Sequence, residues 1–195
     1  MAVIEGYQAG FDEVGRGCLA GSVIAAAVIL PVGETIEGLT DSKKLSAARR
    51  EALAEIIKAK AIAYAIGRAD PSEIDDINIL NASLLAMERA FRGLSVRPTI
   101  ALVDGNHAPN LPIESRTIIG GDGIEPSISA ASILAKVERD LEMTLADALY
   151  PGYGFKIHKG YPTPLHRDAL NTLGPSPLHR KSFGPVRAVL ERSSP

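Results

Sequence analysis

Acidic side chains occur at three points of the chain where chemistry could take place. Asp12 and Glu13 are adjacent in GFDEVGRG, Asp104 lies in VDGN, and Asp122 lies in GGDG. Each group adjoins glycine and a segment whose composition is typical of a β-strand. Carboxylates that the fold brings together form a set of oxygen ligands for divalent metal ions. Mg²⁺ and Mn²⁺ are the ions that prefer such ligands.

A centre of this kind suits the hydrolysis of a phosphodiester. Two divalent ions about 3.5–4 Å apart can activate a water molecule and stabilise the leaving oxygen. Zinc is not indicated, because the sequence has no Cys/His cluster. Taken separately, Asp104-Gly and Asp122-Gly are ordinary turn pairs, and the Asp12-Glu13 pair could end a strand in solvent. The metal centre is predicted only when all three groups are considered together.

A glycine turn and a lysine could contact a substrate. The segment Gly15-Arg16-Gly17 lets the backbone approach a ligand closely, because glycine has no Cβ. Its amide and carbonyl groups could bind a sugar hydroxyl, or it could simply connect two strands tightly. Lys43 lies in the motif DSKK just before Ser46, which we expect to cap a helix. It could contact a phosphate there, although a solvated charged turn explains the same residues.

Basic residues are concentrated at the end of the chain. Residues 151–195 carry seven Lys and Arg against two acids, while the whole chain has a net charge of −2. We expect this segment to contact substrate phosphates, the alternative being a basic terminus with no partner. Within it, Lys156, His158, Lys159 and Tyr161 lie close together. An aromatic ring among basic residues is typical of a nucleic-acid contact.

Composition is that of a globular protein. Hydrophobic residues make up 46% and charged residues 23% of the 195 residues, which predicts a single domain over 1–195. The apolar runs are shorter than the roughly 18 residues of a membrane span, so no membrane partner is expected. The N-terminus has no signal-like stretch, and the single Cys18 suits a reducing compartment. We therefore expect a cytoplasmic protein, with a monomer as the default.

The elements that must carry these residues alternate along the chain. Strands are expected at 7–11, 22–30, 61–67, 98–103 and 115–119. Helices are expected at 46–60, 80–92, 126–149, 163–173 and 185–192, with a turn or short helix at 71–73. Strands that cluster early and later alternate with helices predict an α/β fold with a mixed sheet covered on both faces.

The motifs together form one ordered series. From residue 7 to residue 186 the chain contains GFDEVGRGCLAGSV, LTDSKKLS, VDGN, GGDG with SISAASILAKVERD, GYGFKIHKGYPTPLH and GPSPLHRKSF. This series resembles the ribonuclease HII family, the type 2 ribonucleases H, in its bacterial form. Six blocks in the same order make the resemblance specific, whereas no single block would.

The resemblance implies a fold and an activity. The fold would be ribonuclease H-like, a five-stranded mixed sheet flanked by helices with a C-terminal helical segment. The activity would be Mg²⁺- or Mn²⁺-dependent cleavage of the RNA strand of an RNA–DNA hybrid. Cleavage would include the 5′ side of a single ribonucleotide embedded in duplex DNA, leaving 3′-hydroxyl and 5′-phosphate ends. The cellular role would be removal of misincorporated ribonucleotides and RNA primers.

The resemblance also implies roles for individual residues. The four acidic ligands of the family fall on Asp12, Glu13, Asp104 and Asp122. Its substrate-contacting residues fall on Gly15, Arg16 and Gly17 for the 2′-hydroxyl, on Lys43 for a phosphate, and on Tyr161 for the nucleotide junction. The sequence departs from the family at Cys18 and Ser22, where the family often has proline, so the rigidity of the glycine turn is in question.

Two other functions would use much of the same sequence. A two-metal nuclease of the same fold could share the acids and cut DNA that has no ribonucleotide. A non-catalytic protein could bind hybrids without cleaving them, although the four intact acids argue against lost activity. The type 3 ribonucleases H are disfavoured, because they carry an additional N-terminal domain for which the residues before Tyr7 leave no room.

Overall fold

A mixed β-sheet forms the centre of the molecule. The computed structural model describes residues 6–40 and 42–193. Within them, five strands pair in the order β3-β2-β1-β4-β5. The strands are β1 (Gln8–Val14), β2 (Val23–Ile29), β3 (Ala63–Ala69), β4 (Ile100–Asp104) and β5 (Glu114–Ile118). β2 is antiparallel to β1 and β3, whereas β1, β4 and β5 run parallel. The predicted mixed α/β sheet is confirmed.

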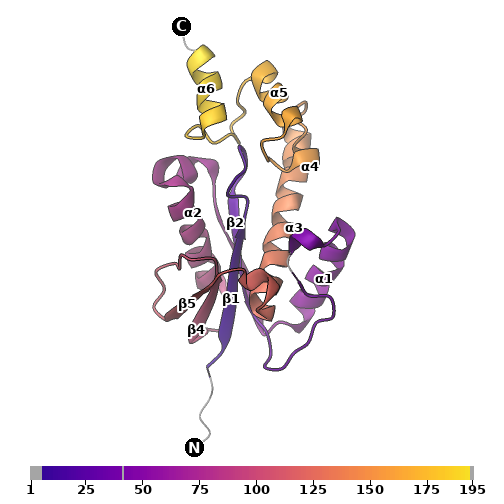
Figure 1. Cartoon of the computed structure of the whole chain (residues 1–195), viewed down its shortest axis with the longest axis vertical. Coiled ribbons are helices and arrows are strands. Elements are labelled where there is room, and N and C mark those ends of the chain that lie inside the picture. The colour runs from indigo at the N-terminus through magenta and orange to yellow at the C-terminus, as the bar shows by residue number, and fades with distance from the viewer. Residues whose placement is uncertain (1–5, 41, 194–195) are drawn as a thin grey trace, which may run out of the picture.

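Helices cover both faces of this sheet. α2 (Pro71–Gly93) packs on one face, and α1 (Ala47–Lys60) and α3 (Pro126–Leu149) pack on the other (Figure 1). The sequence of β2, VIAAAVI, is apolar at every position and fully buried. A strand covered on both faces has this unbroken apolar pattern. β1 and β2 therefore form the rigid centre from which the acidic residues are presented.

β1 is longer than predicted. We expected a strand that ended at Phe11, with the two acids directly after it and before the glycine turn. Instead the ladder with β2 continues, so that Asp12 pairs with Ala26 and Glu13 with Ala25. Both acids are therefore held by strand geometry, because the apolar β2 offers partners along its whole length.

α3 lies very close to β1. Its bounds agree with the prediction, and its first half is rich in buried serine and alanine. A Cβ added to Gly10 of β1 would lie 2.1 Å from the backbone carbon of Ser127, so only glycine permits this approach. Small residues on both sides bring the start of α3 next to the acids of β1.

α1 begins where the sequence indicated. The Ser46 side chain accepts a hydrogen bond from the Arg49 amide, which is an N-cap. A short 3-10 helix, η1 (Ser42–Lys44), precedes it and carries Lys43. Asp41 of the DSKK motif lies outside the described residues.

α2 differs from the prediction. A turn or short helix was expected at 71–73 and a separate helix from Leu80, but one helix begins at Pro71, where Asp70 and Glu73 form a capping box. Asn78 interrupts it with φ 67° and ψ 165°, and the Asn78 side chain accepts a hydrogen bond from the Asn81 amide at 3.1 Å. The predicted helix is therefore the second of two segments, and its apolar periodicity did not extend across the break.

The C-terminal residues gather at one end of the sheet. They form α4 (Phe155–His158), α5 (Pro164–Leu173) and α6 (Gly184–Ser193), beyond the loop that joins β1 to β2 (Figure 1). Ala20 of that loop forms an isolated β-bridge with His179. The C-terminal helical segment is thus built onto the β1–β2 loop. None of the helices in the described residues is both long and apolar enough to span a membrane.

Candidate metal centre and active site

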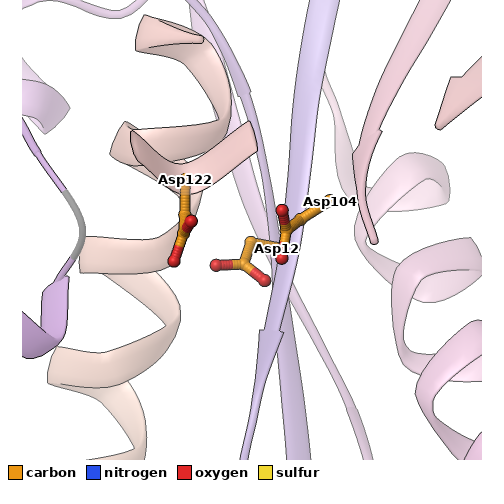
Figure 2. Close-up of side chains that lie close together, drawn as sticks. All are labelled: Asp12, Asp104 and Asp122. Carbon is orange, nitrogen blue, oxygen red and sulfur yellow. The ribbon is translucent and has the colours of Figure 1, made fainter. Parts of the chain in front are cut away.

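Three carboxylates meet at the carboxyl end of β4. Asp12, Asp104 and Asp122 each present a carboxylate oxygen, and these oxygens all lie within 4.8 Å of one another. Figure 2 shows the three side chains arranged around a common space. Asp12 comes from β1, Asp104 ends β4, and Asp122 lies in the short helix η2 (Gly121–Gly123). Residues more than 100 positions apart in the sequence are therefore brought together.

Strand pairing and a turn set this arrangement. β1 and β4 are parallel neighbours with Phe11 opposite Val103, so the next residues on each strand, Asp12 and Asp104, emerge side by side. The Gly121 amide donates a hydrogen bond to Asp104 Oδ1 at 2.8 Å and draws the turn toward β4. Each element contributes one acid, which is the reason that the centre needs a folded sheet.

Asp122 is fixed from α3. Ser129 Oγ donates a hydrogen bond to the main-chain carbonyl of Asp122 at 2.6 Å. Gly120, just before η2, has φ 68°, a conformation that favours glycine. Lys43 Nζ lies 3.6 Å from Asp122 Oδ2 on the open side, with a side chain that is 77% exposed. The lysine in η1 therefore pairs with the acid in η2 beside the centre.

Asp12 is the buried member of the group. The residue is 6% exposed, and burial together with the negative charges of Glu13 and Asp104 raises its pKa well above the ordinary value. Hydrogen bonds from Ser132 and from the Glu13 amide partly oppose this rise in pKa. Clustered carboxylates that repel one another are stabilised by bound cations. These three oxygen donors fit hard divalent ions, so the residues present are suited to the predicted metal.

Glu13 lies on the other face of β1. Successive side chains of a strand point to opposite faces, so Glu13 faces α2 while Asp12 faces α3. Its Oε1 accepts a hydrogen bond from Arg16 Nη1 at 3.2 Å, and burial raises its pKa against the effect of that arginine. Glu13 and Asp104 both line a cavity of about 80 Å³. Among the described residues, the group of three therefore does not include the fourth predicted acid, which borders the centre through Asp104.

The glycine turn leaves the strand directly after the acids. Gly15 has φ 96°, and a Cβ there would lie 2.5 Å from Arg139 Nε, so another residue would be strained. A Cβ at Gly17 would meet no atom within 4 Å. Arg16 between them is exposed. One glycine is therefore required by the protein's own packing, while the other leaves space at the surface.

Tyr161 follows α4 in the C-terminal part of the chain. It is 39% exposed, and its main-chain carbonyl accepts a hydrogen bond from His166 Nδ1 at 2.9 Å. Burial raises its pKa, and the positive charges of Arg139 and Lys43 lower it to a smaller extent.

Buried serines around the centre form hydrogen bonds with it, which was not predicted from the sequence. Ser132 of α3 bonds Asp12 and also shares a 2.8 Å hydrogen bond with Ser42, which precedes Lys43. The serines in SISAAS were interpreted as small residues for close packing, and their spacing of three, from Ser129 to Ser132, would have placed both on the sheet-facing side. This signal was present but ambiguous.

The basic C-terminal segment requires one correction. Arg180 is not at the surface, because it is 0% exposed and donates hydrogen bonds to main-chain carbonyls. Lys159 also donates inward, to the Asp140 carbonyl and Thr144 Oγ1. A count of Lys and Arg residues along the sequence does not distinguish such inward-facing residues from residues that could bind phosphate. The exposed basic residues of the segment are Lys156, Arg167, Lys181, Arg187 and Arg192.

Solved structures resemble this fold closely. The ribonuclease H2 of Pyrococcus horikoshii OT3 matches with a TM-score of 0.79 and 26% identity, covering 95% of this chain and 98% of that one. The RNase HII of Archaeoglobus fulgidus, solved in a PCNA complex, matches with a TM-score of 0.73 and 28% identity, covering 91% and 95%. Bst-RNase HIII with Mn²⁺ shares the fold at 16% identity and a TM-score of 0.75, covering 97% and 71%.

The sequence itself matches a known family over nearly all of the described residues. The sequence model of the family described as Ribonuclease HII matches residues 9–186, a range that contains every acid of the centre, the glycine turn, Lys43 and Tyr161. The match covers most of the chain, and the fold of the two archaeal proteins agrees with it. The chain therefore belongs to the ribonuclease HII family.

Proposed function

We propose that this protein cleaves duplex DNA on the 5′ side of a single embedded ribonucleotide, leaving 3′-hydroxyl and 5′-phosphate ends. As a family member it is a ribonuclease H, a metal-dependent enzyme that hydrolyses the RNA strand of RNA–DNA hybrids. The observation that carries the proposal is the carboxylate centre of Asp12, Asp104 and Asp122, which lies directly beside the glycine turn.

In this proposal the four acids hold the metal ions. Two divalent ions, Mg²⁺ or Mn²⁺, supply Lewis acidity that activates a water and stabilises the leaving 3′-oxygen. Asp12, Asp104 and Asp122 hold them through carboxylate oxygens that lie within 4.8 Å of one another. Glu13 contributes from the cavity that it shares with Asp104. Asp12 is held by Ser132 and by the Glu13 amide, so its carboxylate keeps one orientation.

The substrate contacts follow from the surroundings of the centre. Lys43, whose Nζ lies 3.6 Å from Asp122 Oδ2, holds the phosphate at which cleavage takes place. The turn of Gly15, Arg16 and Gly17 contacts the 2′-hydroxyl, the group that distinguishes RNA from DNA. Tyr161 contacts the sugar or base next to the ribonucleotide. The protein acts as a monomer.

The test is a cleavage assay on a DNA duplex with one ribonucleotide, beside the same duplex with deoxyribose throughout. Each is incubated with Mg²⁺, Mn²⁺ or EDTA, and the product ends are mapped. We expect metal-dependent cleavage at the 5′ side of the ribonucleotide and none in the control duplex. Cleavage of both duplexes would identify a general two-metal nuclease. Binding with no cleavage in any metal would leave a non-catalytic hybrid-binding protein.

A further inference from the structure

Two arginines are buried behind the glycine turn. Arg139 of α3 is 1% exposed and Arg180, just before α6, is 0% exposed. Arg139 Nη1 lies 4.0 Å from Glu142, while Arg180 forms no ion pair within the described part of the chain. Burying a charge without a counter-charge is costly unless hydrogen bonds replace the lost water. The bonds that compensate Arg180 therefore indicate what it does.

Arg180 binds main-chain carbonyls at both ends of the β1–β2 loop. Its Nη2 donates to the Gly15 carbonyl at 2.7 Å, and its Nη1 donates to the Arg16 carbonyl at 2.9 Å. Its Nε and Nη2 donate to the Gly21 carbonyl at 3.0 and 2.8 Å. The planar guanidinium presents several donors in one fixed fork, a geometry that the ammonium of lysine lacks. One side chain thus fixes three peptide groups of the loop.

These bonds determine which way the amides of the turn face. In a trans peptide the C=O and N–H groups point in opposite directions, and the peptides of this chain include no cis bond within the described residues. Because the Gly15 and Arg16 carbonyls point toward Arg180, the Arg16 and Gly17 amides point away from it. Neither amide donates a hydrogen bond to any of the described residues. A Cβ on Gly17 would meet nothing within 4 Å, so there is open space beside this part of the turn.

Arg180 is itself firmly held. Its own amide donates to the Leu19 carbonyl at 2.9 Å, and its guanidinium lies 5.1 Å from the centre of the Phe183 ring. Its neighbour His179 forms the β-bridge with Ala20. Burial lowers its pKa only to about 10, so it remains charged at neutral pH. The guanidinium that donates to the carbonyls of the turn is therefore held in one orientation and stays charged.

We propose that Arg180 is a positioning residue that orients the Gly15–Gly17 turn, so that the Arg16 and Gly17 amides face the ribonucleotide sugar. This rests on the proposed function, in which the turn contacts the 2′-hydroxyl. Arg180 touches neither metal ligands nor substrate, and acts through the turn alone. The C-terminal segment would thereby influence selectivity for ribose through a buried residue that does not contact the substrate.

The test compares Arg180→Lys with Arg139→Lys. Arg139 is a matched control because it is equally buried and donates to carbonyls of the same loop, those of Ala20 and Ser22, but to neither carbonyl of Gly15 or Arg16. Single-turnover cleavage of a duplex with one ribonucleotide is measured with enzyme in saturating excess over substrate. Affinity for the all-DNA duplex is measured alongside. Saturation makes the rate independent of any unfolded fraction.

We expect Arg180→Lys to lower the saturated cleavage rate by about 10- to 100-fold, since a displacement near 1 Å costs about this much. Its affinity for the all-DNA duplex should stay within about twofold of wild type, the scatter of an unrelated site. Arg139→Lys should lower the saturated cleavage rate less than Arg180→Lys does. If Arg180→Lys does not fold, Arg180→Gln replaces it in the same assay.

Three results would overturn the inference. A saturated rate of Arg180→Lys close to that of wild type would show that the turn does not depend on Arg180. Equal losses in both variants would mean that any buried arginine here has only a structural role. A wild-type protein that fails to cleave at the ribonucleotide would remove the proposed function, and this inference with it. Only the last result affects the proposed function.

Discussion

Asp12 and Glu13 are adjacent in the sequence but face opposite sides of β1. The resemblance implies that both hold metal; among the described residues Asp12 groups with Asp104 and Asp122, and Glu13 borders this group through the cavity that it shares with Asp104. The pair was expected directly after the strand, where side-chain direction is not fixed, whereas in the structure both residues lie within the strand and point to opposite faces. At the level of single residues, chemical type was predictable but direction depended on one strand boundary.

The buried carboxylate of Asp12 should weaken the protein when no metal is bound. Its folded pKa is raised, so its contribution to stability is present at low pH and is lost as the pH rises through that pKa. At neutral pH, Asp12→Asn should therefore raise the metal-free Tm by a few degrees, corresponding to about 1–3 kcal/mol for one unfavourable buried group. Thermal unfolding with EDTA and then with Mn²⁺ measures this.

The same variant should lose cleavage by orders of magnitude while keeping its affinity for hybrids. Added Mn²⁺ should raise the Tm of wild type, and raise that of Asp12→Asn much less. Glu114→Gln, a change to an exposed acid of β5 that pairs with Arg116, is the control and should respond to Mn²⁺ as wild type does. Wild-type turnover in Asp12→Asn would contradict the assignment of this residue.

Lys43 should contribute to affinity through charge. We expect Lys43→Ala to weaken binding to every duplex, and to reduce the slope of log affinity against log salt by about one, as for loss of one phosphate contact. Lys44→Ala removes an exposed lysine at the next position and serves as the control. Binding titrations at several salt concentrations compare the two. Equal slopes for Lys43→Ala and wild type would show that Lys43 contacts no phosphate.

α3 is the element that organises the site. Its serines hold Asp122 and Asp12, its Lys136 and Asp140 form an ion pair at 2.6 Å, and Asp140 also binds Arg50. The bounds of α3 were predicted correctly, because a proline at its start and a long apolar period define it locally. For the first half of α2 only a turn or short helix at 71–73 was predicted, and the short α4 was not predicted, because their helical form depends on a cap, a break and neighbouring loops.

Because α3 lies so close to β1, adding one methyl group at Gly10 should destabilise the fold. In Gly10→Ala the new Cβ would lie 2.1 Å from the Ser127 backbone, so α3 must move away from the strand. We expect a loss of about 1–3 kcal/mol in the free energy of unfolding, as for other overpacked cores. Gly184→Ala, where a Cβ meets nothing within 4 Å, should change it by less than about 0.5 kcal/mol. Urea unfolding measures both, and equal stabilities would contradict this packing.

At the scale of the whole molecule, buried histidines form a hydrogen-bonded network in the C-terminal part. His179 and His166 share a hydrogen bond of 3.0 Å between their Nε2 atoms. The Ser176 amide donates to His179 Nδ1, and His166 Nδ1 lies 2.9 Å from the Tyr161 carbonyl. His179 must then donate through Nε2 to His166, and His166 through Nδ1 to Tyr161, so both rings are neutral. Such tertiary networks, like the bonds of Arg180, involve distant residues and could not be predicted from local sequence.

This network should make the protein sensitive to acid. Burial lowers the pKa of His166 and of His179 from 6.5 to about 4. A depressed folded pKa gives stability that is present above pH 6.5 and is lost as the pH falls toward about 4. We expect the urea midpoint of wild type to fall over this interval, and that of His166→Gln to fall less steeply. Asp12 and Glu13 contribute an opposite slope in both proteins, so the difference between them isolates the histidine.

His107→Gln is the control for this experiment, because His107 is exposed in the loop after β4. Its urea midpoint should follow that of wild type at every pH. If His166→Gln and wild type lost stability in parallel between pH 6.5 and 4, the buried rings would not be neutral in the folded protein.

Arg180 also bears on the order in which the protein becomes functional during its synthesis. It is separated from Gly15 by 165 positions, and the isolated bridge joins Ala20 to His179 across a similar distance. The strands, the carboxylates and the serines that hold the carboxylates all lie within residues 8–132, whereas the Gly15 carbonyl acquires its donor only after Arg180 has left the ribosome. Contacts between such distant residues also form slowly. On the proposed role of Arg180, a nascent chain that has not yet reached residue 180 would possess the acids before its glycine turn could select ribose.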